Sequence, residues 1–186
     1  MVTDQGDVLD PSDAELVADA RRGARDAVES LIRRHQGVVF RYVMSMLRDP
    51  DRSSDVSQDT FLKALRNLDR FRGDSSFRTW LLSIARREAL GALRSERGQR
   101  CVPLEGHEVI PGSGSGPDAH AIQSDEVRRI RAALDRLPEK QRSSVSLRLF
   151  DGLSFREIGE VIGSSEGAAR VNYHYGINRL REWLHE

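Results

Sequence analysis

The stretch from Leu153 to Leu184 constrains the fold of this chain more than any other, because it has the pattern of a helix-turn-helix. Ser154 and Glu157 have the spacing of a capping box, in which each side chain satisfies a free backbone N–H at a helix start. Apolar residues at helical spacing follow, and Gly163 suits the left-handed turn that ends such a helix. A second helix is therefore predicted to begin near Ser165.

This second helix is predicted to have one buried and one exposed face. The buried stripe consists of Ala169, Tyr173, Ile177, Leu180 and Leu184. The opposite side is then free to enter a DNA major groove, and its candidate base-reading residues are Arg170, Val171, Asn172, His174 and Tyr175. Helix-turn-helix patterns are degenerate, so a helical hairpin that only packs against its neighbours is the alternative. Gly176 within the helix costs about 1 kcal/mol relative to alanine, which indicates close packing or close approach to DNA.

Charge and composition exclude several classes of protein. The 186 residues include 29 basic and 29 acidic side chains, and zero net charge argues against tight DNA binding by the chain alone. No apolar run approaches the roughly 20 residues of a membrane span, and the acidic N-terminus does not resemble a signal peptide. A cytoplasmic protein without membrane insertion is expected. The single Cys101 excludes an internal disulfide and lacks partners for a zinc site, so no metal or other cofactor is expected.

Helical periodicity is lost over residues 99–123, which predicts a flexible linker between two small helical domains. Three prolines and the run GSGSGPD interrupt any regular element there. The domains are expected over residues 13–98 and 124–186, after a disordered tail at residues 1–12. No alternating strand pattern occurs, so the predicted fold class is all-α.

The helices of both domains can be placed from their caps and periodicity. In the N-terminal domain a long helix is predicted to begin at Ser12 and to end at Asp49-Pro50. Helices over residues 54–68 and 77–97 follow, separated by a loop with Gly73 at its bend. In the C-terminal domain a helix over residues 124–137 precedes one with Pro138 at its first position, and the helix-turn-helix comes last.

The charges are segregated along the chain. Residues 86–100 are basic, whereas the N-terminal tail and the segment around Asp55 and Asp59 are acidic. Such segregation indicates one surface for nucleic acid and another for a protein partner. A solvated helix surface with mixed charges is the alternative.

Three segments in this order resemble the bacterial sigma-70 family, and closely its extracytoplasmic-function group, which keeps only regions 2 and 4. They are DVSQDTFLKAL from Asp55, LDRFRGDSSFRTWLLSIARREAL from Leu68, and ALDRLPEKQRSSVSLRLFDGLSFREIGEVIG from Ala133. The resemblance covers nearly the whole chain from Asp13. It implies an RNA polymerase sigma factor, with core RNA polymerase, promoter DNA and an anti-sigma factor as partners.

The resemblance also implies roles for individual residues. The polymerase-binding residues are Asp55, Gln58, Asp59, Phe61 and Leu62. Recognition and melting of the −10 element fall to Phe71, Arg72, Gly73, Asp74, Ser75, Ser76, Phe77, Trp80, Ile84 and Arg87. Aromatic rings, glycine backbone donors and hydroxyls suit an unstacked base, and Arg78, Arg86 and Arg87 suit the phosphates. Trp80 is assigned mainly to the core, where it shapes the base pocket. The exposed face of the second helix of the helix-turn-helix is assigned to the −35 element.

Two other functional classes fit parts of the chain. A helix-turn-helix transcriptional regulator that does not join core polymerase explains the C-terminal motif but leaves DVSQDTFLKAL and FRGDSSFRTW unexplained. An enzyme would have only Cys101, His107 and His120 as a nucleophile and base, and all lie in the predicted linker, where catalytic geometry is hard to maintain. The chain is therefore expected to act by binding and not as an enzyme.

Overall fold

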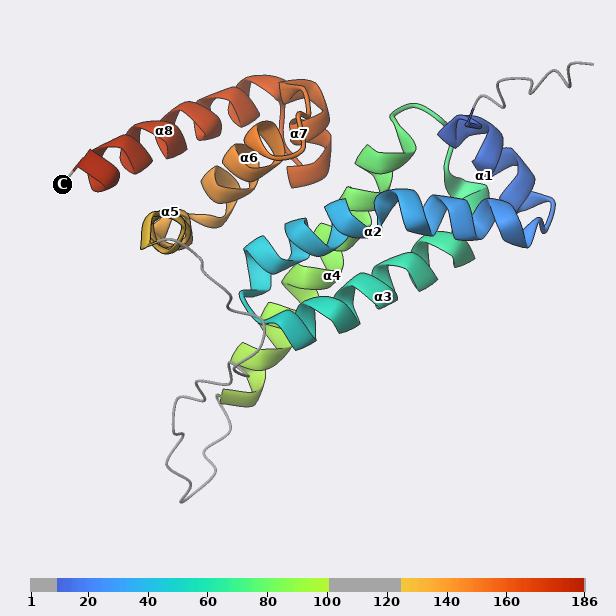
Figure 1. Cartoon of the computed structure of the whole chain (residues 1–186), viewed down its shortest axis with the longest axis horizontal. Coiled ribbons are helices and arrows are strands. Elements are labelled where there is room, and N and C mark those ends of the chain that lie inside the picture. Colours follow the sequence, from blue (N-terminus) through green and yellow to red (C-terminus); the bar gives the residue numbers. More distant parts are fainter. Residues whose placement is uncertain (1–9, 101–124, 186) are drawn as a thin grey trace, which may run out of the picture.

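The computed structural model describes residues 10–100 and 125–185, and all regular structure in these ranges is helical (Figure 1). The N-terminal half comprises α1 (Asp13–Arg21), α2 (Arg25–Leu47), α3 (Pro50–Arg66), a 3-10 turn (Leu68–Arg70) and α4 (Phe77–Arg100). The C-terminal half comprises α5 (Asp125–Arg136), α6 (Glu139–Leu149), α7 (Phe155–Ile162) and α8 (Glu166–His185). The predicted all-α class is confirmed. Residues 1–9 of the predicted tail and residues 101–123 of the predicted linker, with Cys101, His107 and His120, lie outside the described residues.

The single long helix predicted from Ser12 to Asp49 is wrong, because the chain forms α1 and α2 with a turn between them. The capping box that starts α1 is present: the backbone N–H of Ser12 donates to the Glu15 carboxylate at 2.8 Å. Gly23 in the turn has a φ of 90°, a conformation that L-residues with a side chain rarely adopt. It allows α1 to fold back along α2 (Figure 1).

Two other helix starts differ from the prediction by a few residues. The helix predicted over residues 54–68 begins at Pro50, because Asp49 accepts a hydrogen bond from the backbone N–H of Arg52 and caps the helix. Pro138 is the N-cap of α6 and not its first helical residue, since its ψ of 146° is extended. The start of α3 is therefore four residues earlier than predicted, and that of α6 one residue later.

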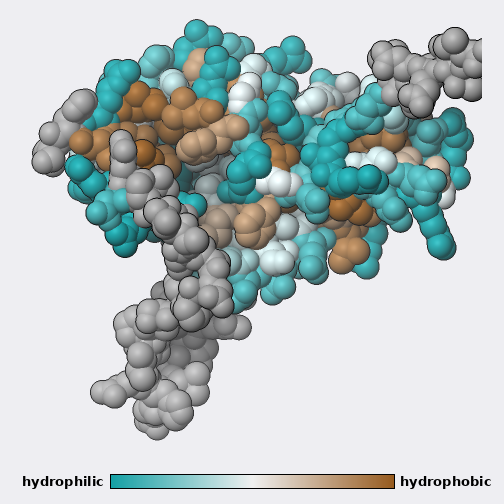
Figure 2. All heavy atoms as spheres, viewed as in Figure 1, coloured by the Kyte–Doolittle hydropathy of each residue, from teal (hydrophilic) through white to brown (hydrophobic). Residues whose placement is uncertain are grey.

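The larger apolar core lies among α2, α3 and α4 and continues into α7 of the C-terminal half. Its fully buried members include Val39, Leu81 and Leu82 from the N-terminal half and Leu153 and Ile158 from the C-terminal half. A smaller cluster joins α5, α6 and α8, and Figure 2 shows apolar side chains gathered over this part of the molecule. The two halves therefore pack against each other through an apolar contact.

The predicted helix-turn-helix is formed by α7 and α8. Ser154 and Glu157 make the capping box of α7, and Gly163 ends this helix with a φ of 64°. The predicted inward stripe of α8 is confirmed, with Ala169 and Leu180 buried and the other members partly buried. Gly176 packs against α6, where a Cβ atom would lie 2.7 Å from Cγ2 of the buried Val145. Close helix packing accounts for this glycine.

The turn of the helix-turn-helix leaves no room for a side chain at Gly159. A Cβ atom there would lie 2.9 Å from the carbonyl oxygen of Ser164, a backbone atom of the turn. We expect Gly159→Ala to lower the free energy of unfolding by about 1–3 kcal/mol, because the turn must shift. Gly91→Ala is the matched control, since a Cβ atom at Gly91 meets nothing within 4 Å. Urea unfolding measures both variants, and undiminished stability of Gly159→Ala would contradict this close packing.

Candidate nucleic-acid interface

The residues predicted to read bases share the outward side of the front half of α8. Arg170, Val171, His174 and Tyr175 are exposed, and Asn172 is partly buried. The Asn172 side-chain amide donates to the backbone oxygen of Ala168 at 2.9 Å. The surface thus presents a guanidinium, an imidazole and a phenol side by side, groups that can contact base edges or phosphates.

The loop before α4 is held at both ends. Arg21 of α1 donates to the carbonyl oxygen of Leu68 at 2.9 Å and also to that of Phe71. Ser76 accepts a hydrogen bond from the backbone N–H of Thr79 at 3.1 Å and so caps α4. Between these ends Gly73 has a φ of 81°, which places the bend where it was predicted. The remaining loop side chains, from Arg72 to Ser76, are exposed or partly exposed.

Two residues predicted to contact DNA lie in the core. Phe77 is 3% exposed and Ile84 is 6% exposed, so the described arrangement leaves neither side chain available to a base. The reason is the register of α4, which begins at Phe77 and turns positions 77, 81, 84 and 85 inward. Phe71 and Trp80 are only partly buried, with ring centroids 5.3 Å apart. Trp80 packs on the core as predicted.

The predicted polymerase-binding residues lie on the free side of α3. Asp55, Gln58 and Asp59 are exposed, and Leu62 is an apolar residue with 51% of its surface exposed. Phe61 is partly buried at the edge of the same face. Among the described residues neither Asp55 nor Asp59 has a hydrogen bond or ion pair. The face is therefore free to contact a partner.

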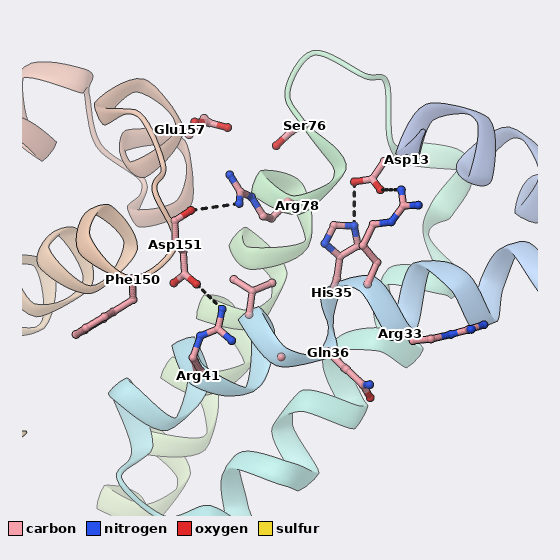
Figure 3. Close-up of a pocket in the computed structure, with 13 residues that line it drawn as sticks. Asp13, Arg33, His35, Gln36, Arg41, Ser76, Arg78, Phe150, Asp151 and Glu157 are labelled. Carbon is pink, nitrogen blue, oxygen red and sulfur yellow. Dashed lines mark hydrogen bonds and ion pairs between the residues drawn. The ribbon is translucent and has the colours of Figure 1, made fainter. Parts of the chain in front are cut away.

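Contacts between the two halves engage basic side chains that were assigned to DNA. Arg86 of α4 pairs with the Glu139 carboxylate through two hydrogen bonds of 3.1 and 3.2 Å. Arg78 of α4 donates to the backbone oxygen of Asp151 at 3.2 Å, and Arg41 of α2 donates to the Asp151 carboxylate at 2.8 Å (Figure 3). Sequence spacing does not predict these contacts, because each joins residues at least 53 positions apart.

A cavity of about 730 Å³ lies at this junction, lined by α2, the start of α4 and the loop between α6 and α7 (Figure 3). On its N-terminal wall, burial lowers the pKa of His35, although its contact with Asp13 at 2.9 Å opposes that shift. On the other wall, the pKa of Glu157 is lowered. Burial opposes this shift, but the hydrogen bonds from Ser154 and Thr79 outweigh it. Glu157 therefore faces α4 as an anion.

Within the described ranges, no group of three or more His, Cys, Asp or Glu side chains is placed to hold a metal ion. None of the helices in these ranges is long and apolar enough to span a membrane.

Comparison with known proteins identifies the family of this chain. The family described as Sigma-70 region 2 matches residues 31–99, and the family described as Sigma-70 region 4 matches residues 127–180. The chain is 35% identical to the RNA polymerase sigma factor CarQ of Myxococcus xanthus, over 89% of this chain and 94% of that protein. It is 33% identical to the ECF RNA polymerase sigma factor SigD of Mycobacterium tuberculosis, over 97% of this chain and 86% of that protein.

Solved structures show the same fold. The structure of CnrH in complex with the cytosolic domain of CnrY superposes with a TM-score of 0.71, at 25% identity, over 94% of this chain and 97% of that chain. The sigma factor RpoE of Bartonella quintana, solved with the anti-sigma factor NepR, has a TM-score of 0.65 at 22% identity, over 84% of this chain and 95% of that chain. The matches to both sigma regions, in order and along nearly the whole chain, show that this protein belongs to the sigma-70 family, as an RNA polymerase sigma factor of the extracytoplasmic-function type.

Proposed function

We propose that the chain starts transcription purely by binding, in the cytoplasm, with residues 13–98 and 124–186 as its two working domains. The observation that carries this proposal is the combination on one chain of an exposed acidic and apolar face on α3 with an exposed reading face on α8. The first face suits a protein surface and the second suits a DNA groove. A regulator that never joins polymerase would need only the second face.

Core RNA polymerase is the partner that we assign to α3. Asp55, Gln58 and Asp59 surround the exposed Leu62, with Phe61 at the edge. An apolar anchor with charges around it is the usual composition of a specific protein interface. The charges set orientation and association rate, while Leu62 loses contact with water on binding.

The loop before α4 is assigned to the −10 element. We keep Phe71, Arg72, Gly73, Asp74, Ser75, Ser76, Trp80 and Arg87 as contacts, because all are exposed or partly exposed. A base released from the duplex can stack on an aromatic ring and hydrogen-bond to the loop. The buried ring of Phe77 packs against both aromatic rings. Its centroid lies 5.7 Å from that of Phe71 and 5.8 Å from that of Trp80.

The −35 element is assigned to Arg170, Val171, Asn172, His174 and Tyr175 of α8. Arg170 suits guanine or phosphate, and the exposed Val171 and Tyr175 suit a thymine methyl. Few cations lie on this face, which fits a protein whose net charge is zero. Polymerase then contributes the remainder of the DNA affinity.

Binding to DNA requires the two halves to separate. Arg86 and Arg78 are occupied by Glu139 and Asp151 in the described arrangement, and phosphates would replace these acidic and carbonyl partners. Both solved relatives named above are complexes, and the partner of the Bartonella protein is called an anti-sigma factor. We assign a partner of this kind to the present chain, acting on the arrangement in which the halves are closed.

The melting role of the loop predicts a specific defect. We expect Phe71→Ala and Asp74→Ala to leave polymerase binding near normal but to reduce the open complex. Stacking on the Phe71 ring is worth about 1–3 kcal/mol per base, and the Asp74 carboxylate can accept hydrogen bonds from a base. Permanganate reactivity of promoter thymines measures opening. Asp69→Ala is the matched control, because Asp69 is an exposed acid of the neighbouring turn with no assigned contact. Normal opening by both loop variants would return the loop to a structural role.

A further inference from the structure

We propose that Phe155 is a positioning residue that holds Arg170 ready for the −35 element. The inference rests on the proposed function of α8 and adds a residue from outside the reading face. Phe155 is the first residue of α7 and is partly buried. Its ring therefore belongs to the scaffold of the helix-turn-helix and faces the recognition helix from the preceding helix.

Two guanidinium groups approach this ring. The central carbon of Arg170 lies 5.1 Å from the ring centroid, and that of Arg148 lies 5.0 Å from it. Both distances fall within the roughly 6 Å over which the negative face of an aromatic ring attracts a cation. Arg148 also donates to the backbone oxygen of Leu153 at 2.9 Å, so its position is tied to the start of α7.

The ring is held in place by α8 as well. Tyr173 packs edge-on against Phe155, with centroids 5.4 Å apart and ring planes at 62°. Tyr173 in turn contacts His174, with centroids 5.6 Å apart. Phe155 thus connects α7 to two neighbouring positions of the reading face, the side chains of Arg170 and His174.

The ring matters because the other contact of Arg170 is weak. Its guanidinium donates to the Glu166 carboxylate at 2.9 Å, but the two side chains are 55% and 52% exposed. An exposed ion pair of this kind restrains a long side chain little. Attraction to a fixed ring restrains the Arg170 guanidinium further, so an arginine already ordered by Phe155 gives up less entropy when it meets a base. A guanidinium has five N–H donors, so those not engaged by Glu166 can still donate to a base.

The test uses the full chain with core RNA polymerase and a promoter library in which the −35 element is randomised. Phe155→Leu removes the ring but keeps an apolar side chain, and Phe155→Tyr keeps the ring. A ring-fluorinated phenylalanine at position 155 keeps the shape and weakens the attraction for cations, so it serves where Phe155→Leu fails to fold. Phe150→Leu is the matched control, because Phe150 is 59% exposed and no cation lies over its ring among the described residues. Sequencing of transcripts gives the base preference of each variant.

We expect Phe155→Leu and the fluorinated ring to lower transcription from the preferred −35 sequence by roughly two- to fivefold. The bases affected should be those affected by Arg170→Ala, and combining Phe155→Leu with Arg170→Ala should add no further loss. Phe155→Tyr and Phe150→Leu should retain the preference. Losses that multiply in the double variant, or that are equal on all sequences, would make Phe155 a structural residue only. If Arg170→Ala leaves the base preference unchanged, Arg170 does not read the −35 element, and this proposal fails with that assignment. If Arg170→Ala shifts the base preference but the Phe155 variants do not, only the positioning by Phe155 is overturned.

Discussion

The double variant Asp55→Arg and Asp59→Arg is expected to bind core RNA polymerase at least about tenfold more weakly, which corresponds to about 1.4 kcal/mol. Both carboxylates are exposed on α3 without a partner among the described residues, so they are available to basic groups on polymerase. Reversal replaces two attractions with two repulsions, and like charges brought together at an interface are costly. The fold should persist, because the buried side of α3 is unchanged.

A fluorescence titration with labelled core polymerase measures this effect, and circular dichroism reports the helical content. The matched control is Glu29→Arg with Asp69→Arg, which makes the same change in net charge at two exposed positions outside α3. The control should bind within about twofold of the unaltered chain, because charges away from an interface act only through a screened field. Equal weakening by both pairs would reduce the effect to net charge and remove α3 from the interface.

A second large effect is expected at the junction of the two halves, where Glu139 engages Arg86. In Glu139→Arg two guanidinium groups face each other and repel. The side chains at positions 86 and 139 are only partly exposed, so solvent screens this repulsion incompletely. We expect the halves to separate more often and the apparent affinity for promoter DNA, measured with core polymerase present, to rise by roughly three- to tenfold. The rise follows because a binding-competent form that is rarely populated weakens the observed affinity in proportion.

Energy transfer between two dyes measures the separation directly. Dyes on Asp69→Cys and Glu182→Cys, in a Cys101→Ser background, report on the N-terminal half and on α8. The charge swap Arg86→Glu with Glu139→Arg should restore the closed form, because it re-forms the pair with the charges exchanged. Unchanged energy transfer in Glu139→Arg, or no recovery in the swap, would show that the ion pair does not control closure.

The parts of the fold that follow local rules could be predicted from the sequence. Capping boxes at Ser12 and Ser154 and the apolar stripe of α8 depend on neighbouring residues, and the structure contains them. The break between α1 and α2 was missed because Gly23 lies in a segment whose helical pattern continues on either side. A single glycine does not distinguish a turn from a tolerated helix position.

In the candidate site, too, features that depend on neighbouring residues could be predicted, and contacts between distant residues could not. The exposure of Asp55, Asp59 and Arg170 follows from helical periodicity, and the structure agrees. The burial of Phe77 and Ile84 follows from the same periodicity, since both share a stripe with Leu81, and their assignment to DNA came only from the family resemblance. The pairing of Arg86 with Glu139 joins residues 53 positions apart across the predicted linker. Such contacts between elements that each carry mixed charges leave no local pattern.

Reconstituted transcription shows whether the chain directs core RNA polymerase to promoters. The purified chain is added to core RNA polymerase with fragments of DNA from its native host, and the 5′ ends of the transcripts are sequenced. We expect transcripts that begin at discrete positions downstream of two shared sequence elements, and their loss when Asp55→Arg and Asp59→Arg are introduced together. A chain that binds DNA on its own and yields no start sites with core polymerase would contradict a role as sigma factor and favour a regulator that does not join the enzyme.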